Sequence, residues 1–128
     1  MSVQTLGKIA AAVLVAALLW PVGTFAAELV MFERAGCPWC QRWDREVGAT
    51  YAKTSEARRL PLRRVDIHSG STGGIVLASP VRYTPTFVVV DEGREVGRIT
   101  GYINDESFWG LLSALAAKLK SARDAGQI

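Results

Sequence analysis

Two cysteines, Cys37 and Cys40, are the residues of this chain whose type and spacing can do chemistry. A thiolate is a nucleophile. Two thiols three positions apart on a helix lie about one turn from each other, within the roughly 4.4–6.8 Å between Cα atoms that a disulfide spans. The pair can therefore pass two electrons by closing and opening one disulfide bond.

The flanking sequence predicts the elements that position this pair. The apolar run 29–32 predicts a strand, residues 33–36 form a short polar linker, and apolar residues recur at helical spacing from Pro38 onward. Cys37 then falls at or near the helix N-cap, and Pro38 falls at the first helical position, where its missing N–H costs nothing. Unpaired N–H groups and the positive end of the helix dipole favour an anion there, so Cys37 is the expected nucleophile.

The cysteine count bounds the alternatives. A small exported domain that depends on structural disulfides carries several cysteines at wide spacings, whereas this chain has only the two cysteines of one CxxC motif. Half of a zinc site is an alternative, but zinc needs four ligands and the only other soft donor is His68, in a Gly- and Ser-rich stretch. An incidental dithiol is the other alternative. We predict a redox-active disulfide and no bound metal or other cofactor.

Residues 1–26 predict a secretory signal peptide. Lys8 supplies the positive charge, residues 9–20 are apolar and uncharged, and Thr24 and Ala26 are small residues placed for a cut after Ala26. Residues 9–27 give 19 uncharged positions, close to the roughly 20 that span a membrane, so a retained N-terminal anchor is the alternative. A buried helix of the folded domain is the third interpretation, but the segment has no polar face that would support it. Export would place the thiols where disulfides are made and broken.

Removal of the signal leaves residues 27–128, or 102 of 128, enough for one small domain. The formal net charge falls from +3 to +2 when Lys8 is lost, and the arginines are scattered. Two adjacent pairs, Arg58-Arg59 and Arg63-Arg64, are best explained as solvent-exposed positions with acidic residues nearby. We therefore expect no nucleic-acid partner.

Periodicity predicts an α/β fold in the order β-α-β-(α)-β-β-α. We expect a four-stranded mixed sheet with helices on both faces. Gly48 weakens the first helix and predicts a kink or an early end there. The expected elements are a strand at 28–32, a helix at 38–51, helical turns within 52–59, a strand at 62–67, a loop at 68–74, one or two helical turns at 75–78, a hairpin of strands 87–90 and 95–100, and a final helix capped by Asn104 or Asp105 and ended by Gly126.

The tryptophans divide by position. Trp39 lies between the cysteines, where we expect it to be exposed and to face a substrate. Trp43 is expected in the core or at the rim of a groove. Helical spacing places Phe108 and Trp109 among the packing residues of the last helix.

Two motifs resemble the thioredoxin superfamily in its compact, glutaredoxin-like form. Residues 32–40, Phe-Glu-Arg-Ala-Gly-Cys-Pro-Trp-Cys, resemble the glutaredoxin active-site segment, and residues 83–87, Tyr-Thr-Pro-Thr-Phe, resemble the superfamily's cis-proline segment. The motifs lie about 45 residues apart, as that fold requires, and the resemblance covers nearly all of the chain after residue 26. Among exported members the chain is most similar to periplasmic thioredoxins of the SoxS type, which implies a periplasmic location.

The resemblance implies roles for six residues. Cys37 would attack a substrate disulfide, and Cys40 would resolve the mixed disulfide. The peptide bond from Thr84 to Pro85 would be cis and lie beside the sulfurs, with its backbone pairing with the bound substrate, while Pro38 and Trp39 would face that substrate. The implied partners are a disulfide-containing protein and a membrane electron donor, and we expect a monomer. An iron–sulfur cluster shared across a dimer, known in glutaredoxins, is disfavoured by Pro38.

The chain departs from thioredoxins in two respects. Met31 stands six residues before the first cysteine, where thioredoxins carry a buried aspartate. The nearest acid is Glu33, so a carboxylate that accepts the proton of Cys40 is not assigned. The extra N-terminal strand and helix of full-length thioredoxin are also lacking.

Three functions remain open from sequence. The first is a periplasmic thiol–disulfide oxidoreductase that reduces a partner protein. The second is an oxidase that introduces disulfides, and the third is a non-catalytic thioredoxin-fold binding domain. The direction of electron flow depends on how far each state stabilises the thiolate, which Pro38 and Trp39 alone do not fix.

Overall fold

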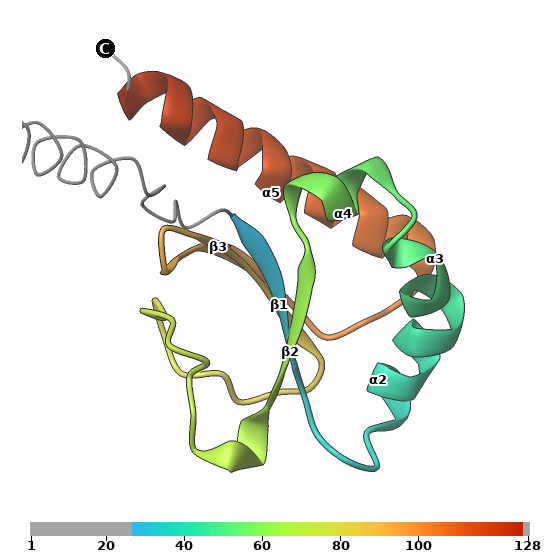
Figure 1. Cartoon of the computed structure of the whole chain (residues 1–128). Helices are drawn as coiled ribbons and strands as arrows, with labels where there is room; N and C mark the ends of the chain where they lie inside the picture. Colours follow the sequence, from blue (N-terminus) through green and yellow to red (C-terminus); the bar gives the residue numbers. More distant parts are fainter. Residues whose placement is uncertain (1–26, 127–128) are drawn as a thin grey trace, which may run out of the picture.

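The computed structural model describes residues 27–126, so the predicted signal peptide or anchor at 1–26 lies outside the described residues. Four strands form one sheet in the order β2-β1-β3-β4 (Figure 1). Strand β1 runs parallel to β2 and antiparallel to β3, and β3 runs antiparallel to β4, which confirms the predicted mixed sheet. The elements are β1 (Glu28–Glu33), α2 (Pro38–Trp43), the π-helical turn η2 (Asp44–Gly48), α3 (Ala49–Tyr51), α4 (Ser55–Arg59), β2 (Leu62–Asp66), the 3₁₀ turn η3 (Ile67–Ser69), β3 (Thr86–Asp91), β4 (Arg94–Thr100) and α5 (Asp105–Gly126).

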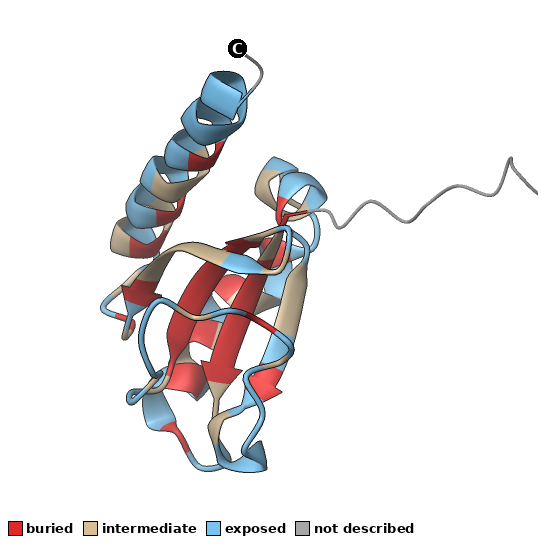
Figure 2. Ribbon diagram, turned by 90° about the vertical axis from the view of Figure 1, so that its left-hand side faces the viewer, coloured by how far each residue is buried: buried red, intermediate tan, exposed pale blue. Residues whose placement is uncertain are grey.

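The two central strands are apolar on both faces because both faces are covered. Residues 29–32 of β1 and 87–90 of β3 are buried (Figure 2). Their side chains alternate between two hydrophobic clusters, one on each face of the sheet. Met31 and Phe87 belong to the cluster on the helix side of the sheet, whereas Phe32 and Val88 belong to the cluster on the other side.

Among residues 27–126, helices cover only one of these faces. Helices α2 and α5 supply the helix-side cluster with Trp43, Phe108 and Leu112. The opposite face is covered by an irregular segment, residues 70–85, whose Ile75, Leu77 and Val81 pack on the sheet. Figure 2 shows this segment crossing in front of the strands. The expectation of helices on both faces is therefore wrong, and we call residues 70–85 the covering segment.

The helical turns expected at 75–78 are also wrong, because the sheet uses the backbone of this stretch. Val76 donates its N–H to the carbonyl of Gly93 at 2.9 Å, and its carbonyl accepts from the N–H of Glu95 at 3.0 Å. The stretch thus forms an isolated parallel bridge to β4. A residue whose backbone N–H and C=O are both hydrogen-bonded to another segment of the sheet cannot also make the hydrogen bonds of a helix.

The helix after the cysteines continues to Tyr51 through a wider turn. Gly48 closes the π-helical turn η2 and α3 continues from Ala49, so the early end is wrong and the predicted irregularity takes the form of a π turn. A Cβ at Gly48 would lie 3.0 Å from the Trp43 ring, so the missing side chain leaves room for the indole. Single π turns occur often at functional sites, and this one begins directly after the CxxC turn.

Aromatic rings support the CxxC helix from below. The Trp43 ring lies 5.1 Å from that of Phe87 and 5.6 Å from that of Phe108, and Tyr51 stacks on Trp109 at 5.9 Å. Trp43 is fully buried, which confirms its core placement, and the packing roles predicted for Phe108 and Trp109 are confirmed as well. Such contacts between rings add about 0.5–1.5 kcal/mol per pair beyond burial.

The last helix begins as predicted. The Asn104 side chain accepts a hydrogen bond from the Ser107 N–H at 2.8 Å, so Asn104 is the N-cap. Leu112 and Leu119 are buried below Phe108, whereas half of Leu111 is exposed. No helix among residues 27–126 has the length and apolar character needed to cross a membrane.

Candidate active site

Cys37 caps helix α2 and is joined to Cys40 by a disulfide. Its backbone is extended at φ −78°, and its sulfur accepts the N–H of Cys40 at 3.1 Å. The Cα atoms of the pair are 5.3 Å apart, inside the range that a disulfide tolerates. Pro38 follows in the first turn of the helix. The predicted placement of both residues is confirmed, and the sulfur sits where a helix start favours negative charge.

A tight turn brings the chain from β1 to this cap. Strand β1 ends at Glu33, and Gly36 has φ +73°, a left-handed conformation that glycine adopts without steric cost. The Cys37 N–H then bonds back to the carbonyl of Arg34. The polar linker predicted at 33–36 is therefore a turn that directs the first cysteine toward the helix side of the sheet.

The disulfide lies below the surface while the residue between the cysteines is exposed. Cys37 exposes 1% of its surface and Cys40 exposes 3%, whereas Trp39 exposes 53%. The predicted exposure of Trp39 is confirmed. Reactive cysteines are usually partly exposed, so an incoming sulfur must shift neighbouring groups to reach Cys37.

The predicted cis-proline is present. The bond from Thr84 to Pro85 is cis, and the Thr86 hydroxyl donates to the carbonyl of Tyr83 at 2.7 Å. The Pro85 carbonyl accepts the N–H of Gly101 at 2.7 Å, which ties this segment to the end of β4.

Strand register brings three loops to one end of the sheet. Thr86 pairs with Phe32 on β1 and with Thr100 on β4. The CxxC turn after β1, the cis-proline before β3 and the loop after β4 therefore emerge side by side. The register thus brings Cys37 and Cys40 to the same edge as Thr84 and Pro85.

Each of these three loops presents one exposed apolar side chain. Trp39 follows the first cysteine, Tyr83 precedes the cis-proline pair and is 67% exposed, and Ile103 follows β4 and is 71% exposed. Large apolar side chains exposed at one end of the sheet indicate a contact surface. The sequence assigned no role to Tyr83 or Ile103, although Tyr83 adjoins a motif and Ile103 lies in a loop just before a helix cap.

A charged network ties the CxxC helix to the loop after β4. Arg42 donates to Glu46 at 2.8 Å, and the hydroxyl of Tyr102 donates to the other oxygen of that carboxylate. The Arg42 guanidinium also lies 5.9 Å from the ring centres of both Trp39 and Tyr102. The hydrogen bond from Tyr102 and the contact with Arg42 lower the pKa of Glu46. Burial and the same hydrogen bond raise the pKa of Tyr102.

No carboxylate lies beneath the disulfide. Among residues 27–126, neither Asp nor Glu belongs to the cluster that contains both cysteines, and Met31 is fully buried in it. Glu33 instead forms an ion pair with Arg64 at 2.7 Å, and Arg64 also pairs with Asp44. The departure from thioredoxins at Met31 therefore leaves an apolar floor, and Glu33 is engaged elsewhere.

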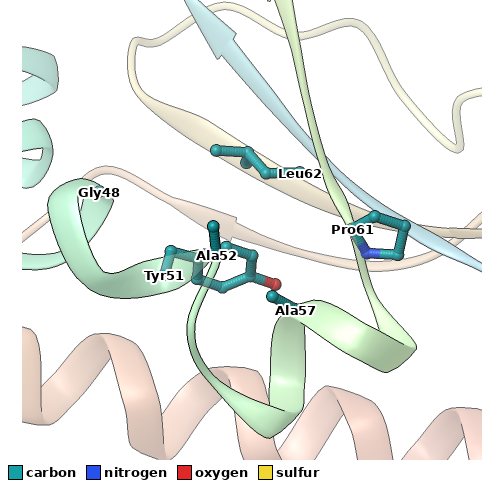
Figure 3. A pocket seen from close by; sticks show the side chains of 6 residues that line it. All are labelled: Gly48, Tyr51, Ala52, Ala57, Pro61 and Leu62. Atoms are coloured by element: carbon teal, nitrogen blue, oxygen red, sulfur yellow. The ribbon is translucent and has the colours of Figure 1, made fainter.

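Two further features are His68 and an apolar hollow. Because Asp66 at the end of β2 pairs with Glu33 at the end of β1, η3 with His68 emerges at the same end of the sheet as the CxxC turn. His68 is exposed in η3, and no three metal-ligating side chains come together in the described part of the chain. A hollow of about 450 Å³ is lined by Tyr51 and Ala57 and by Leu62 at the start of β2 (Figure 3). Leu62 pairs with Leu29, at the start of β1, so this hollow lies at the end of the sheet away from the cysteines.

The model of a thioredoxin-like domain matches residues 26–116 of this sequence. The chain belongs to the thioredoxin-like domain family. Like other members with a CxxC pair, this thioredoxin-like protein has the site of a thiol–disulfide oxidoreductase.

Solved structures agree with this membership. The periplasmic thioredoxin SoxS from Paracoccus pantotrophus, in its reduced form, is 39% identical to this thioredoxin-like protein over 73% of this chain and 98% of that chain, with a TM-score of 0.70. A thioredoxin from Malassezia sympodialis, Mala s 13, is 20% identical over 75% of this chain and 80% of that chain with a TM-score of 0.54, which supports the fold alone. The comparison with curated proteins gives no match.

Proposed function

We propose that this protein is an exported, periplasmic thioredoxin-like reductase that reduces disulfides of a partner protein through Cys37 and Cys40. The observation that carries the proposal is the Cys37 sulfur at the start of α2, which accepts the Cys40 N–H at 3.1 Å. A group that caps a helix this way is favoured as an anion, and the anion is the form that attacks a disulfide.

The reaction balances in two exchange steps. The Cys37 thiolate attacks one sulfur of the substrate disulfide, a mixed disulfide forms, and the other substrate sulfur leaves as a thiolate that takes a proton. The Cys40 thiolate then attacks the Cys37 sulfur, the protein disulfide closes, and the second substrate thiol is released. Two electrons pass to the substrate, and an external dithiol must reduce the Cys37–Cys40 disulfide before the next cycle.

Four further residues would hold the substrate. Thr84 and the cis-linked Pro85 lie at the same sheet end as the cysteines, and Pro85 carries no N–H beside the sulfurs. A substrate strand would pair with the Thr84 backbone, and those of its side chains that point to the helix side, like the attacked cysteine, would contact Pro38 and Trp39, both of which are exposed.

The location and the electron source follow from the same likeness. The signal-like residues 1–26 and the similarity to a periplasmic thioredoxin support export to the periplasm. We expect the protein to act there as a monomer and to receive electrons from a membrane donor. N-terminal sequencing of the exported form should start at Ala27, whereas retention of residues 1–26 would identify an anchor.

The direct test is to trap the partner. With Cys40→Ala the second exchange cannot occur, so a mixed disulfide with the substrate protein should accumulate on Cys37 and disappear on treatment with dithiothreitol. Cys37→Ala with Cys40 intact is the matched control and should trap nothing. Absence of any dithiol-sensitive adduct would refute a catalytic role and leave a binding domain.

The direction of transfer has its own test. Equilibration of the protein with glutathione buffers should give a reduction potential near the reducing end of the family, about −270 mV. A value near the oxidising end, about −120 mV, would assign the protein as an oxidase that introduces disulfides.

A further inference from the structure

A second hollow, of about 320 Å³, adjoins the cis-proline segment. Its lining includes Arg82 and Tyr83 from the covering segment, Thr86 at the start of β3, and Arg98 and Thr100 from β4. Because Thr86 directly follows Pro85, this hollow begins one residue from the segment that we expect to pair with a substrate.

The hollow opens on the face of the sheet opposite the cysteines. Side chains two positions apart on a strand lie on one face, so Thr86 shares the face of Val88 and Val90. Those valines belong to the cluster under the covering segment, whereas the cysteines belong to the helix-side cluster. The disulfide and the hollow therefore lie on opposite faces of the sheet, with the cis-proline segment between them.

The charges in the hollow differ in their availability. Arg98 is bound to Glu95 at 2.8 Å and donates to the Ser79 carbonyl at 2.7 Å, so its charge is neutralised and it holds the covering segment in place. Arg82 is exposed and forms no ion pair with any described residue. The lining also includes Pro80 and the hydroxyl-bearing residues Ser79, Tyr83 and Thr100, while the Thr86 hydroxyl is already bound to the Tyr83 carbonyl. A free cation among hydroxyl groups suits a carboxylate.

Strand alternation connects this hollow to the substrate. A substrate strand that pairs with the Thr84 backbone must point its cysteine to the helix side, toward Cys37. The residues immediately before and after that cysteine then point to the opposite side, where the hollow lies. We infer that the Arg82 hollow selects protein disulfides that carry an acidic residue, Asp or Glu, next to the attacked cysteine. This inference rests on the proposed function, since it names the substrate class of that reaction.

The test uses cystine-bridged peptides that differ only at the residue beside the attacked cysteine, which is Glu, Gln or Lys. For the unaltered protein at low salt, the kcat/KM for the Glu peptide should exceed that for the Gln peptide about three- to fivefold, as an exposed ion pair allows, with the Lys peptide slowest. The preference should shrink in 0.5 M NaCl because salt screens exposed charges.

Three variants make the assignment specific. Arg82→Ala should bring the Glu-to-Gln ratio to about one, and Arg82→Glu should reverse the order so that the Lys peptide is fastest. Arg58→Ala removes an exposed arginine on α4 and should keep the full preference for Glu. Rates with hydroxyethyl disulfide, which has no flanking residue, normalise the activity of each preparation.

The outcomes separate this inference from the proposed function. Reduction of all three peptides at equal rates, or a Glu preference that survives in Arg82→Glu, would overturn the Arg82 hollow while leaving the reductase intact. No reduction of any peptide or of hydroxyethyl disulfide would instead overturn the proposed function itself.

Discussion

The two faces of the sheet are built in different ways, although β1 and β3 present apolar side chains to both. On the helix side, Trp43, Phe87 and Phe108 pack ring against ring beneath the CxxC turn. On the other side, the covering segment has few buried side chains, and arginines hold its backbone. Arg63 donates to the Gly73 carbonyl at 2.9 Å, and Arg98 donates to that of Ser79 at 2.7 Å.

Under the proposed function, this difference would separate chemistry from recognition. The sulfurs must keep their geometry through a cycle of bond making and breaking, and they are mounted on the densely packed face. Residues that contact different substrates are commonly carried on loops above a rigid scaffold. The covering segment is such a loop, and its last residues, Tyr83, Thr84 and Pro85, lie where we expect the substrate to bind. Variants on the two faces test this division of roles.

The largest effect is expected at Trp43. Trp43→Ala should lower the free energy of unfolding by about 3–5 kcal/mol, since it empties the centre of the aromatic cluster. Urea unfolding followed by circular dichroism measures this change. Trp39→Ala is the matched control and should alter stability by less than about 0.5 kcal/mol because that ring is largely exposed. Equal losses in the two variants would contradict the packing described for the helix side.

A second experiment places a charge in the floor beneath the disulfide. Met31→Asp should lower stability at pH 7 by about 3 kcal/mol, because the site is fully buried and apolar. Burial raises the pKa of such a carboxyl in the folded state, so the part of the penalty that comes from ionisation should be absent below the unfolded pKa of about 3.9 and grow as the pH rises above it. The cost of replacing the buried Met31 side chain by a smaller neutral carboxyl should remain at every pH. Met31→Leu keeps the volume and should cost less than about 1.5 kcal/mol at every pH.

The same variant sharpens the chemical comparison. A carboxylate in the cluster that contains Cys40 can accept its proton, so the folded fraction of Met31→Asp, with Cys40 intact, should resolve a mixed disulfide formed on Cys37 faster than Met31→Leu does. Stopped-flow measurement of the released thiol gives both rates. An unchanged rate would mean that Cys40 loses its proton to another acceptor.

On the loop side, Arg98→Ala should have an intermediate effect. It removes the donor to the Ser79 carbonyl and leaves the Glu95 carboxylate, whose side chain is 4% exposed, without its partner. A loss of about 1–3 kcal/mol is expected, together with faster proteolytic cutting within residues 70–82. Arg94→Ala, on the same strand but exposed, should leave both unchanged. Cutting at the same rate in both variants would show that Arg98 does not hold the covering segment.

The smallest effect concerns the network that joins the helix to the loop after β4. Since its partners lower the pKa of Glu46 in the folded state, this group contributes stability above the unfolded pKa of about 4.3, and the contribution is lost as the pH falls through the lower, folded value. Glu46→Gln should therefore lose less stability than the unaltered protein between pH 5 and pH 3. Urea unfolding at several pH values tests this, with Glu106→Gln as the control that should behave like the unaltered protein.

Local patterns were sufficient for much of the fold and site. The run 29–32, the cap formed by Cys37 and Pro38, and the cap formed by Asn104 are each encoded within a few residues. The cis-proline and the CxxC pair were assigned from short motifs, and the register then brought them to the same edge.

The remaining features depend on contacts between distant residues. Residues 75–78 are not helical because the backbone of Val76 is hydrogen-bonded to Gly93 and Glu95, and the hydrophobic pattern of that stretch does not predict these bonds. Glu46 and Tyr102 are 56 positions apart, so their hydrogen bond leaves no local pattern. At Gly48 the low helix propensity was visible, but the close approach of the Trp43 ring, which leaves little room for a Cβ there, was not.

The depth of the two sulfurs has a further consequence. Because Cys37 and Cys40 together show almost no surface, a small thiol that collides at random meets very little sulfur. A protein that first docks on the rim can displace the groups above the pair and hold the opening. Exchange of the disulfide with low-molecular-weight thiols should therefore proceed, but more slowly than exchange with a protein that docks.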